Sequence, residues 1–165
     1  MMIEPAHSKL FSPELIFIED ATTQEDVFKQ VSARLETLGA VKPTFYDNLT
    51  ERERNYPTGI DMSVVNTDYP NVAIPHTEGE FVNTRRIVPI KLNHPITFHN
   101  MIDPEQTFPV KFLFMILNND PEGQANVLAQ IMDFLTTTPQ SELENLFNAT
   151  DTDSIYQLLA THFKN

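Results

Sequence analysis

Apolar residues recur at helical spacing in five parts of this chain. In the first part, Thr22 and Glu25 match a capping box, which predicts a helix start, and Gly39 predicts its end. The buried face of this predicted helix consists of Val27, Phe28, Val31, Leu35 and Leu38.

Four further helices follow from the same spacing. One spans about 44–54, buries Phe45 and Leu49, and ends before Pro57-Thr58-Gly59. Another begins at Asp120-Pro121, because aspartate caps a helix and proline fits its first turn. Its predicted buried positions are Val127, Leu128, Ile131, Met132 and Leu135. The last two helices are expected near residues 141–147 and 153–163.

Short apolar runs between these segments predict strands. The strongest is 110–117, whose almost unbroken apolar sequence is typical of a strand buried on both faces. Residues 87–92 form another run, and Pro89 assigns it to a sheet edge because proline cannot donate to the ladder. A third run ends at Pro75-His76, which also indicates an edge that reagents can reach. Shorter extended pieces are expected at 14–18, 58–62 and 96–98.

The order of these elements predicts an α/β fold in a single domain over residues 1–165. A mixed sheet of about five strands, sandwiched by helices, suits this order best. The chain has 165 residues, enough to bury a core, and no repeat or low-complexity linker divides it. Residues 1–12 are expected to be a mobile N-terminal segment.

Composition and charge exclude several classes of function. The chain has no cysteine, which excludes disulfides and thiolate metal sites and suits a cytoplasmic protein. No apolar run reaches the roughly 20 residues that span a bilayer, so direct membrane insertion is not expected. The net charge of −12 opposes binding to nucleic acid. It would favour a basic protein partner or simply secure solubility.

His76 is the leading candidate for chemistry, because imidazole titrates near neutrality and can act as nucleophile, proton carrier or metal ligand. A purely structural histidine is the alternative. Four of the five arginines lie in the window from Arg52 to Arg86, within an otherwise acidic chain. This suits a phosphoryl group or carboxylate, and equally suits ordinary surface ion pairs.

Other common sites lack their usual markers. His94 and His99 lie five residues apart on a short predicted strand and face opposite sides, which argues against a shared metal site. The sequence has no P-loop, dinucleotide, serine-hydrolase or zinc-protease motif. No cofactor and no metal are therefore expected.

Three short motifs occur in a fixed order with fitting gaps: Glu51-Arg52-Glu53, Tyr56-Pro57-Thr58-Gly59-Ile60 and Val72-Ala73-Ile74-Pro75-His76. Together they resemble the fructose/mannitol-type enzyme IIA domains of the bacterial phosphoenolpyruvate-dependent sugar phosphotransferase system. The second motif and Asn118-Asn119-Asp120-Pro121-Glu122 look most like the galactitol-type branch. The resemblance covers roughly residues 23–163 and implies the mannitol-type IIA fold.

The resemblance implies that His76 takes a phosphoryl group from the phosphocarrier protein HPr and passes it to an enzyme IIB. Arg52 would offer donors to the phosphoryl oxygens, and Glu53 would hold that arginine or a neighbouring backbone group. The Thr58 hydroxyl would donate to the phosphoryl group or orient the ring. Gln124 stands where many members carry a second histidine, and its amide can still donate a hydrogen bond.

Alternatives remain for these residues and for the whole domain. Arg52 and Glu53 could form a helix-end ion pair, and Thr58 could be a turn residue. The domain could be a regulatory module that is phosphorylated and binds a protein partner without feeding a transporter. It could also be a degenerate binding domain, with Gln124 as the hint. The sugar is not encoded here, because enzyme IIA does not contact it.

Overall fold

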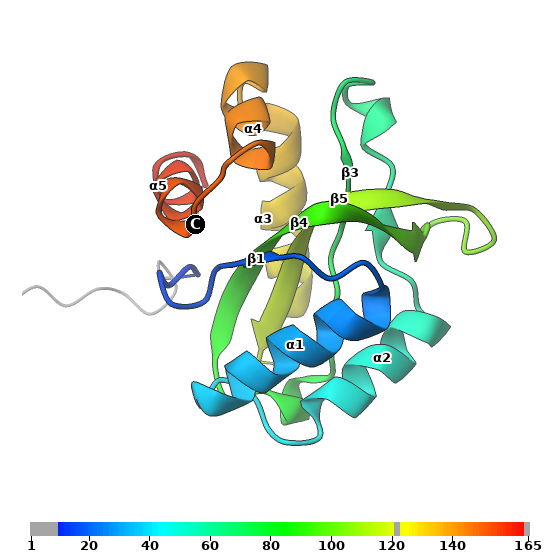
Figure 1. The fold of residues 1–165 in the computed structure, drawn as a ribbon, viewed down its shortest axis with the longest axis vertical. Helices are drawn as coiled ribbons and strands as arrows, with labels where there is room; N and C mark the ends of the chain where they lie inside the picture. The colour runs from blue at the N-terminus through cyan, green and yellow to red at the C-terminus, as the bar shows by residue number, and fades with distance from the viewer. Residues whose placement is uncertain (1–9, 121–122, 164–165) are drawn as a thin grey trace, which may run out of the picture.

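The computed structural model describes residues 10–120 and 123–163. Its centre is a five-stranded sheet in the order β1-β4-β5-β3-β2 (Figure 1). β4 pairs antiparallel with β5 and parallel with β1, while β3 pairs parallel with β5 and antiparallel with β2. This mixed sheet confirms the predicted fold class. The strands are β1 (Phe17–Glu19), β2 (Gly59–Ile60), β3 (Asn71–Ala73), β4 (Arg85–His99) and β5 (Thr107–Asn118).

Helices cover both faces of the sheet (Figure 1). One face packs against α1 and α2, and the other packs against α3, α4 and α5, so the molecule has two apolar cores. Phe114 and Ile116 of β5 point into one core, and Leu113 and Met115 point into the other. This alternation confirms that the 110–117 run is buried on both faces. The helices are α1 (Gln24–Thr37), α2 (Phe45–Asn55), α3 (Gln124–Thr137), α4 (Gln140–Phe147) and α5 (Thr152–His162), with short 3-10 turns η2 (Met62–Val64) and η3 (Gly79–Phe81).

The prediction that Pro89 lies on an edge strand is wrong. Pro89 belongs to β4, an interior strand that also absorbs the separate piece predicted at 96–98. The amide of Ile87 donates to the Leu10 carbonyl, so the nitrogen of Pro89, two residues later, faces the same side. β1 begins to pair with β4 only at Ile90. An interior strand therefore accommodates the proline just before its short neighbour begins.

Two predicted helix starts are displaced. Thr23, not Thr22, caps α1 by accepting a hydrogen bond from the Asp26 amide at 3.1 Å. α3 begins at Gln124 with Gly123 at its N-cap rather than at Asp120-Pro121, and Pro121 lies outside the described residues. The end of α1 is as expected, since Gly39 has a φ of +76°, in the left-handed region that favours glycine.

The first described residues differ from the expectation of a mobile segment over 1–12. Leu10, Phe11 and Ser12 are buried. The Leu10 carbonyl accepts from Ile87, and the Ser12 hydroxyl accepts from Arg86 Nε at 2.9 Å. Residues 1–9 lie outside the described part of the chain.

Candidate active site

His76 follows β3 by three residues and lies beside the end of β5. The amide of Ile116 donates to the Pro75 carbonyl at 3.0 Å, and His76 forms a bridge with Ile116. The predicted edge position of this run is wrong, because β2 flanks β3 on its outer side. β2 pairs only with Val72 and Ala73, so His76 extends past the end of that outer strand. His76 is partly buried.

The imidazole is held in one orientation by its own backbone. Nδ1 lies 2.9 Å from the carbonyl oxygen of Ile74. A carbonyl can only accept, so Nδ1 carries the proton and Nε2 keeps its lone pair in the neutral ring. Burial lowers the pKa of His76, and the charge of Arg52 lowers it further, while the hydrogen bond to Ile74 and the charge of Glu78 oppose this shift. The neutral ring is therefore the form present at neutral pH.

Arg52 reaches the same region from the last turn of α2. Its Nη1 donates to Glu78 Oε1 at 2.8 Å, and its guanidinium lies over the ring of Tyr56, 5.4 Å from the centroid. Nε of Arg52 is buried and has no hydrogen-bond partner among the described residues. The arginine thus keeps one unused donor, and its charge acts on His76.

Glu53 and Thr58 form a buried pair behind this surface. Glu53 Oε2 accepts from the Thr58 amide at 2.8 Å, and Oε1 accepts from the Thr58 hydroxyl at 2.7 Å. Burial raises the pKa of Glu53 to about 7, although the two hydrogen bonds from Thr58 favour the charged form. The structure therefore supports the expectation that Glu53 holds a neighbouring backbone group. Arg52 pairs with Glu78 instead, so the helix-end Arg52–Glu53 ion pair is not formed.

The Thr58 hydroxyl donates to Glu53 and the residue is buried, so donation from this hydroxyl to a phosphoryl group stays a prediction. Thr58 acts through its backbone instead. Its carbonyl accepts from the Ile74 amide at 3.1 Å, and the Ile74 carbonyl fixes the ring of His76. A chain of contacts thus runs from the carboxylate of Glu53 to the imidazole.

Gly59, next in the motif, is explained by a close approach of two backbones. A Cβ atom at this position would lie 2.6 Å from the carbonyl oxygen of His99, closer than real Cβ contacts. The glycine therefore keeps β2 against the end of β4, which fixes the Thr58 turn.

A family model described as "Phosphoenolpyruvate-dependent sugar phosphotransferase system, EIIA 2" matches residues 9–162, nearly the whole chain. The chain belongs to this enzyme IIA family. No curated protein matches the sequence. The assignment to a galactitol-type branch stays a prediction.

Several solved structures share the fold of this enzyme IIA domain. The mannitol IIA of Escherichia coli has 21% identity and a TM-score of 0.68, and the match covers 90% of this chain and 98% of that one. A complex of the same bacterium's mannitol enzyme IIA with phosphorylated enzyme IIB gives 22% identity, a TM-score of 0.68 and coverage of 92% and 97%. The nitrogen regulatory protein IIA-Ntr of Neisseria meningitidis has 15% identity, a TM-score of 0.60 and coverage of 93% and 98%. At these identities the likeness establishes the fold alone.

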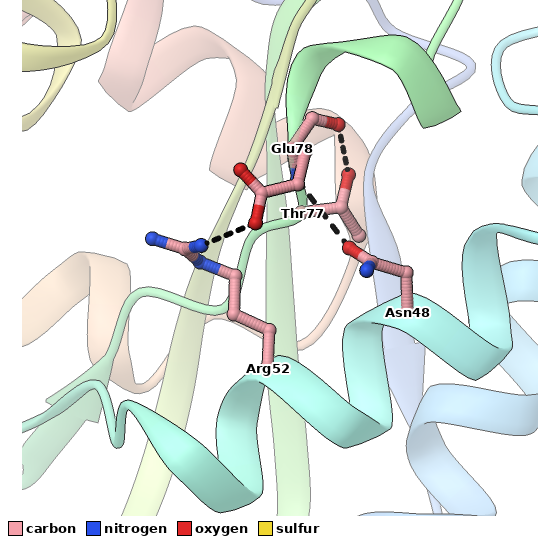
Figure 2. Close-up of polar contacts among 4 residues, drawn as sticks. All are labelled: Asn48, Arg52, Thr77 and Glu78. Carbon is pink, nitrogen blue, oxygen red and sulfur yellow. Dashed lines mark hydrogen bonds and ion pairs between the residues drawn. The ribbon is translucent and has the colours of Figure 1, made fainter.

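Three further residues of this enzyme IIA domain lie at the site and were not predicted from the sequence (Figure 2). Glu78 pairs with Arg52, and its amide donates to Asn48 Oδ1 at 3.4 Å. The Thr77 hydroxyl donates to the Glu78 carbonyl at 2.9 Å. Asn48 and Arg52 lie four residues apart, so both stand on one face of α2. That spacing was a signal available in the sequence.

Gln124 is the first residue of α3, and its side chain lies outside the described part of the structure. Its role therefore stays a prediction. Within residues 10–120 and 123–163, no group of three or more His, Cys, Asp or Glu residues could hold a metal ion. The same part of the chain has no helix long and apolar enough to cross a membrane.

Proposed function

We propose that this enzyme IIA domain carries a phosphoryl group on Nε2 of His76, which it accepts from HPr and passes to an enzyme IIB. One observation carries the proposal: the Ile74 carbonyl binds Nδ1, so the neutral ring presents the lone pair of Nε2. Neutral imidazole is a good nucleophile toward phosphorus. No cofactor or metal takes part in this proposal.

In the first step the Nε2 lone pair forms a bond to phosphorus while the nitrogen–phosphorus bond of phospho-HPr breaks. The electron pair of the broken bond returns to the HPr imidazole. Positive charge develops on the ring of His76 as the bond forms, and the Ile74 carbonyl, already 2.9 Å from Nδ1, stabilises it. In the second step a nucleophile of enzyme IIB takes the phosphoryl group, and Nε2 regains its lone pair.

Arg52 is the residue suited to the phosphoryl oxygens. Its charge acts on His76, and its buried Nε has no partner within the described residues. A planar guanidinium can bind two phosphoryl oxygens with two parallel hydrogen bonds. Catalysis then rests on positioning and on charge, as is usual for phosphoryl transfer.

The partners are proposed from the family and from a structural neighbour. A mannitol enzyme IIA of this fold forms a complex with phosphorylated enzyme IIB. HPr and enzyme IIB would dock briefly and in turn, burying little area, in the cytoplasm. Selection of the sugar belongs to the membrane component, which this domain meets only indirectly.

The test is an intact-mass assay after incubation with phosphoenolpyruvate, enzyme I and HPr. The wild-type protein should gain one acid-labile phosphoryl group, which should leave when an accepting enzyme IIB is added. His76→Ala should gain none, whereas His94→Ala, a change at an exposed histidine of β4, should behave as wild type. A folded wild-type protein that stays unmodified beside active phospho-HPr would refute the proposal.

A further inference from the structure

Glu78 binds the Arg52 guanidinium, the charged group that the proposed chemistry needs. It is two residues after His76, and its carboxylate holds Arg52 through a 2.8 Å ion pair (Figure 2). Both residues act on the electrostatics of the imidazole, in opposite directions. In the unphosphorylated protein the Glu78 carboxylate therefore neutralises Arg52, beside the ring that would carry the negatively charged phosphoryl group.

The backbone beneath Glu78 is held separately from its side chain. Asn48 accepts from the Glu78 amide, and Thr77 donates to the Glu78 carbonyl (Figure 2). The Asn48 contact, at 3.4 Å, ties the Glu78 backbone to α2, and the Thr77 contact lies within the segment, so neither depends on the carboxylate. The Glu78 side chain is 56% exposed, so its carboxylate can turn into water, whereas the Arg52 side chain is 27% exposed and would need another anionic partner. The ion pair can thus open without moving the segment.

A phosphoryl group on Nε2 would bring negative charge beside the Glu78 carboxylate. Like charges repel each other, and the phosphoryl group and the carboxylate would compete for the donors of Arg52. Since the phosphoryl group carries more charge and more acceptor oxygens than a carboxylate, it is the stronger partner for a guanidinium.

We propose that Glu78 is the resident counter-ion of Arg52, that the phosphoryl group on His76 displaces it, and that Glu78 thereby raises the readiness of His76 to release the group. The inference rests on the proposed function and adds a positioning residue to it. Glu78 stabilises the unphosphorylated state by its ion pair and disfavours the phosphorylated state by repulsion. Both effects move the equilibrium toward transfer onward.

The experiment measures the equilibrium between this domain and HPr, using defined amounts of phospho-HPr and intact mass as readout. Glu78→Gln keeps an oxygen that can accept from Arg52 but removes the charge. It should shift the equilibrium constant toward the phosphorylated domain by about two- to fivefold, the range for a partly exposed ion pair. Glu80→Gln removes the same charge from an exposed residue two positions on and should leave the constant unchanged. Glu78→Asp should lie closer to wild type.

A second readout follows the carboxyl carbon of Glu78 by NMR in labelled wild-type protein. Phosphorylation should move this resonance toward that of the exposed carboxylate of Glu80. Equal shifts for Glu78→Gln and Glu80→Gln, or a Glu78 resonance that does not respond, would overturn the inference while the wild type still accepts phosphate. A wild type that accepts no phosphate would instead overturn the proposed function, and this inference with it.

Discussion

Two neighbouring residues in the last turn of α2 make different contacts around the site, one buried and one exposed. Glu53 points inward, where it is 5% exposed and holds both the amide and the hydroxyl of Thr58. Arg52 points outward and binds Glu78, whose side chain is more than half exposed. The same helix end therefore supplies one buried contact and one exposed contact around His76.

The difference lies in what each contact can do. A buried pair with two hydrogen bonds cannot open without leaving polar groups unsatisfied, so it fixes geometry. An exposed ion pair is weak and can exchange its partner for a stronger one. We conclude that the Glu53–Thr58 contact positions the strand that carries His76, and that the Arg52–Glu78 contact is the adjustable part of the site.

Removing the imidazole of His76, around which both contacts lie, has the largest expected effect. His76→Ala should abolish phosphoryl acceptance, because no other group presents the Nε2 lone pair here. The helical circular dichroism signal and the melting transition should stay near those of wild type, since the ring is only partly buried. Mass and melting measurements on the same sample check both points. An unfolded variant would make His76 a structural residue.

Removal of the exposed Arg52–Glu78 contact has the next largest expected effect. Arg52→Ala should slow phosphoryl transfer about a hundredfold, as expected when one preorganised donor group to the transferring oxygens is lost. HPr affinity should change less than the rate. Rapid-quench kinetics and a binding titration separate the two effects. A loss of affinity at an unchanged rate would reassign Arg52 to docking.

Breaking the buried side should affect folding. Glu53→Ala leaves the amide and hydroxyl of Thr58 without their partner and should lower the free energy of unfolding by about 2–3 kcal/mol. Glu53→Gln should be milder, because an amide can accept from the Thr58 amide and donate to its hydroxyl oxygen. Urea denaturation checks this order. Wild-type stability in Glu53→Ala would mean that the pair does not position the site.

The raised pKa of Glu53, about 7 against an ordinary 4.5, makes its contribution to the free energy of unfolding depend on pH. The folded state binds the proton more tightly than the unfolded state between these values. Stability should therefore be highest at and below about pH 4.5 for this group and fall as pH rises to about 7, by about 3 kcal/mol in total. Glu53→Gln should remove this contribution. Unfolding free energies of both proteins across this range supply the test, and parallel curves would contradict it.

The smallest effect concerns the charge balance at His76. Arg52 lowers the pKa of the imidazole, so Arg52→Ala should raise it. Glu78→Gln removes a group that raises it and should shift the pKa downward. NMR titration of the ring measures both. Shifts of the same sign in the two variants would show that charge is not the cause.

The sequence predicted the parts of the fold that depend on local pattern. The periodic apolar faces of α1 and α2 and the unbroken run in β5 appear where they were expected, except that Leu38 follows the end of α1 and is 51% exposed. The interior position of β4 could not be read from the sequence, because it depends on where β1 begins to pair relative to Pro89.

The candidate site follows the same division. His76, Arg52 and Glu53 were found from their motifs, and the structure brings them to one region. The use of the Thr58 hydroxyl was not predictable, since it depends on which buried acceptor lies within reach. Glu78 was missed because its partner is 26 residues away in sequence, on another element.

The most direct test of the account is to ask which nitrogen of His76 carries the phosphoryl group. Long-range proton–nitrogen NMR of the labelled ring, before and after phosphorylation by phospho-HPr, answers this. We predict a proton on Nδ1 in the free protein and a nitrogen–phosphorus coupling at Nε2 in the phosphorylated one. Phosphate on Nδ1, or a free ring protonated at Nε2, would contradict the role assigned to the Ile74 carbonyl.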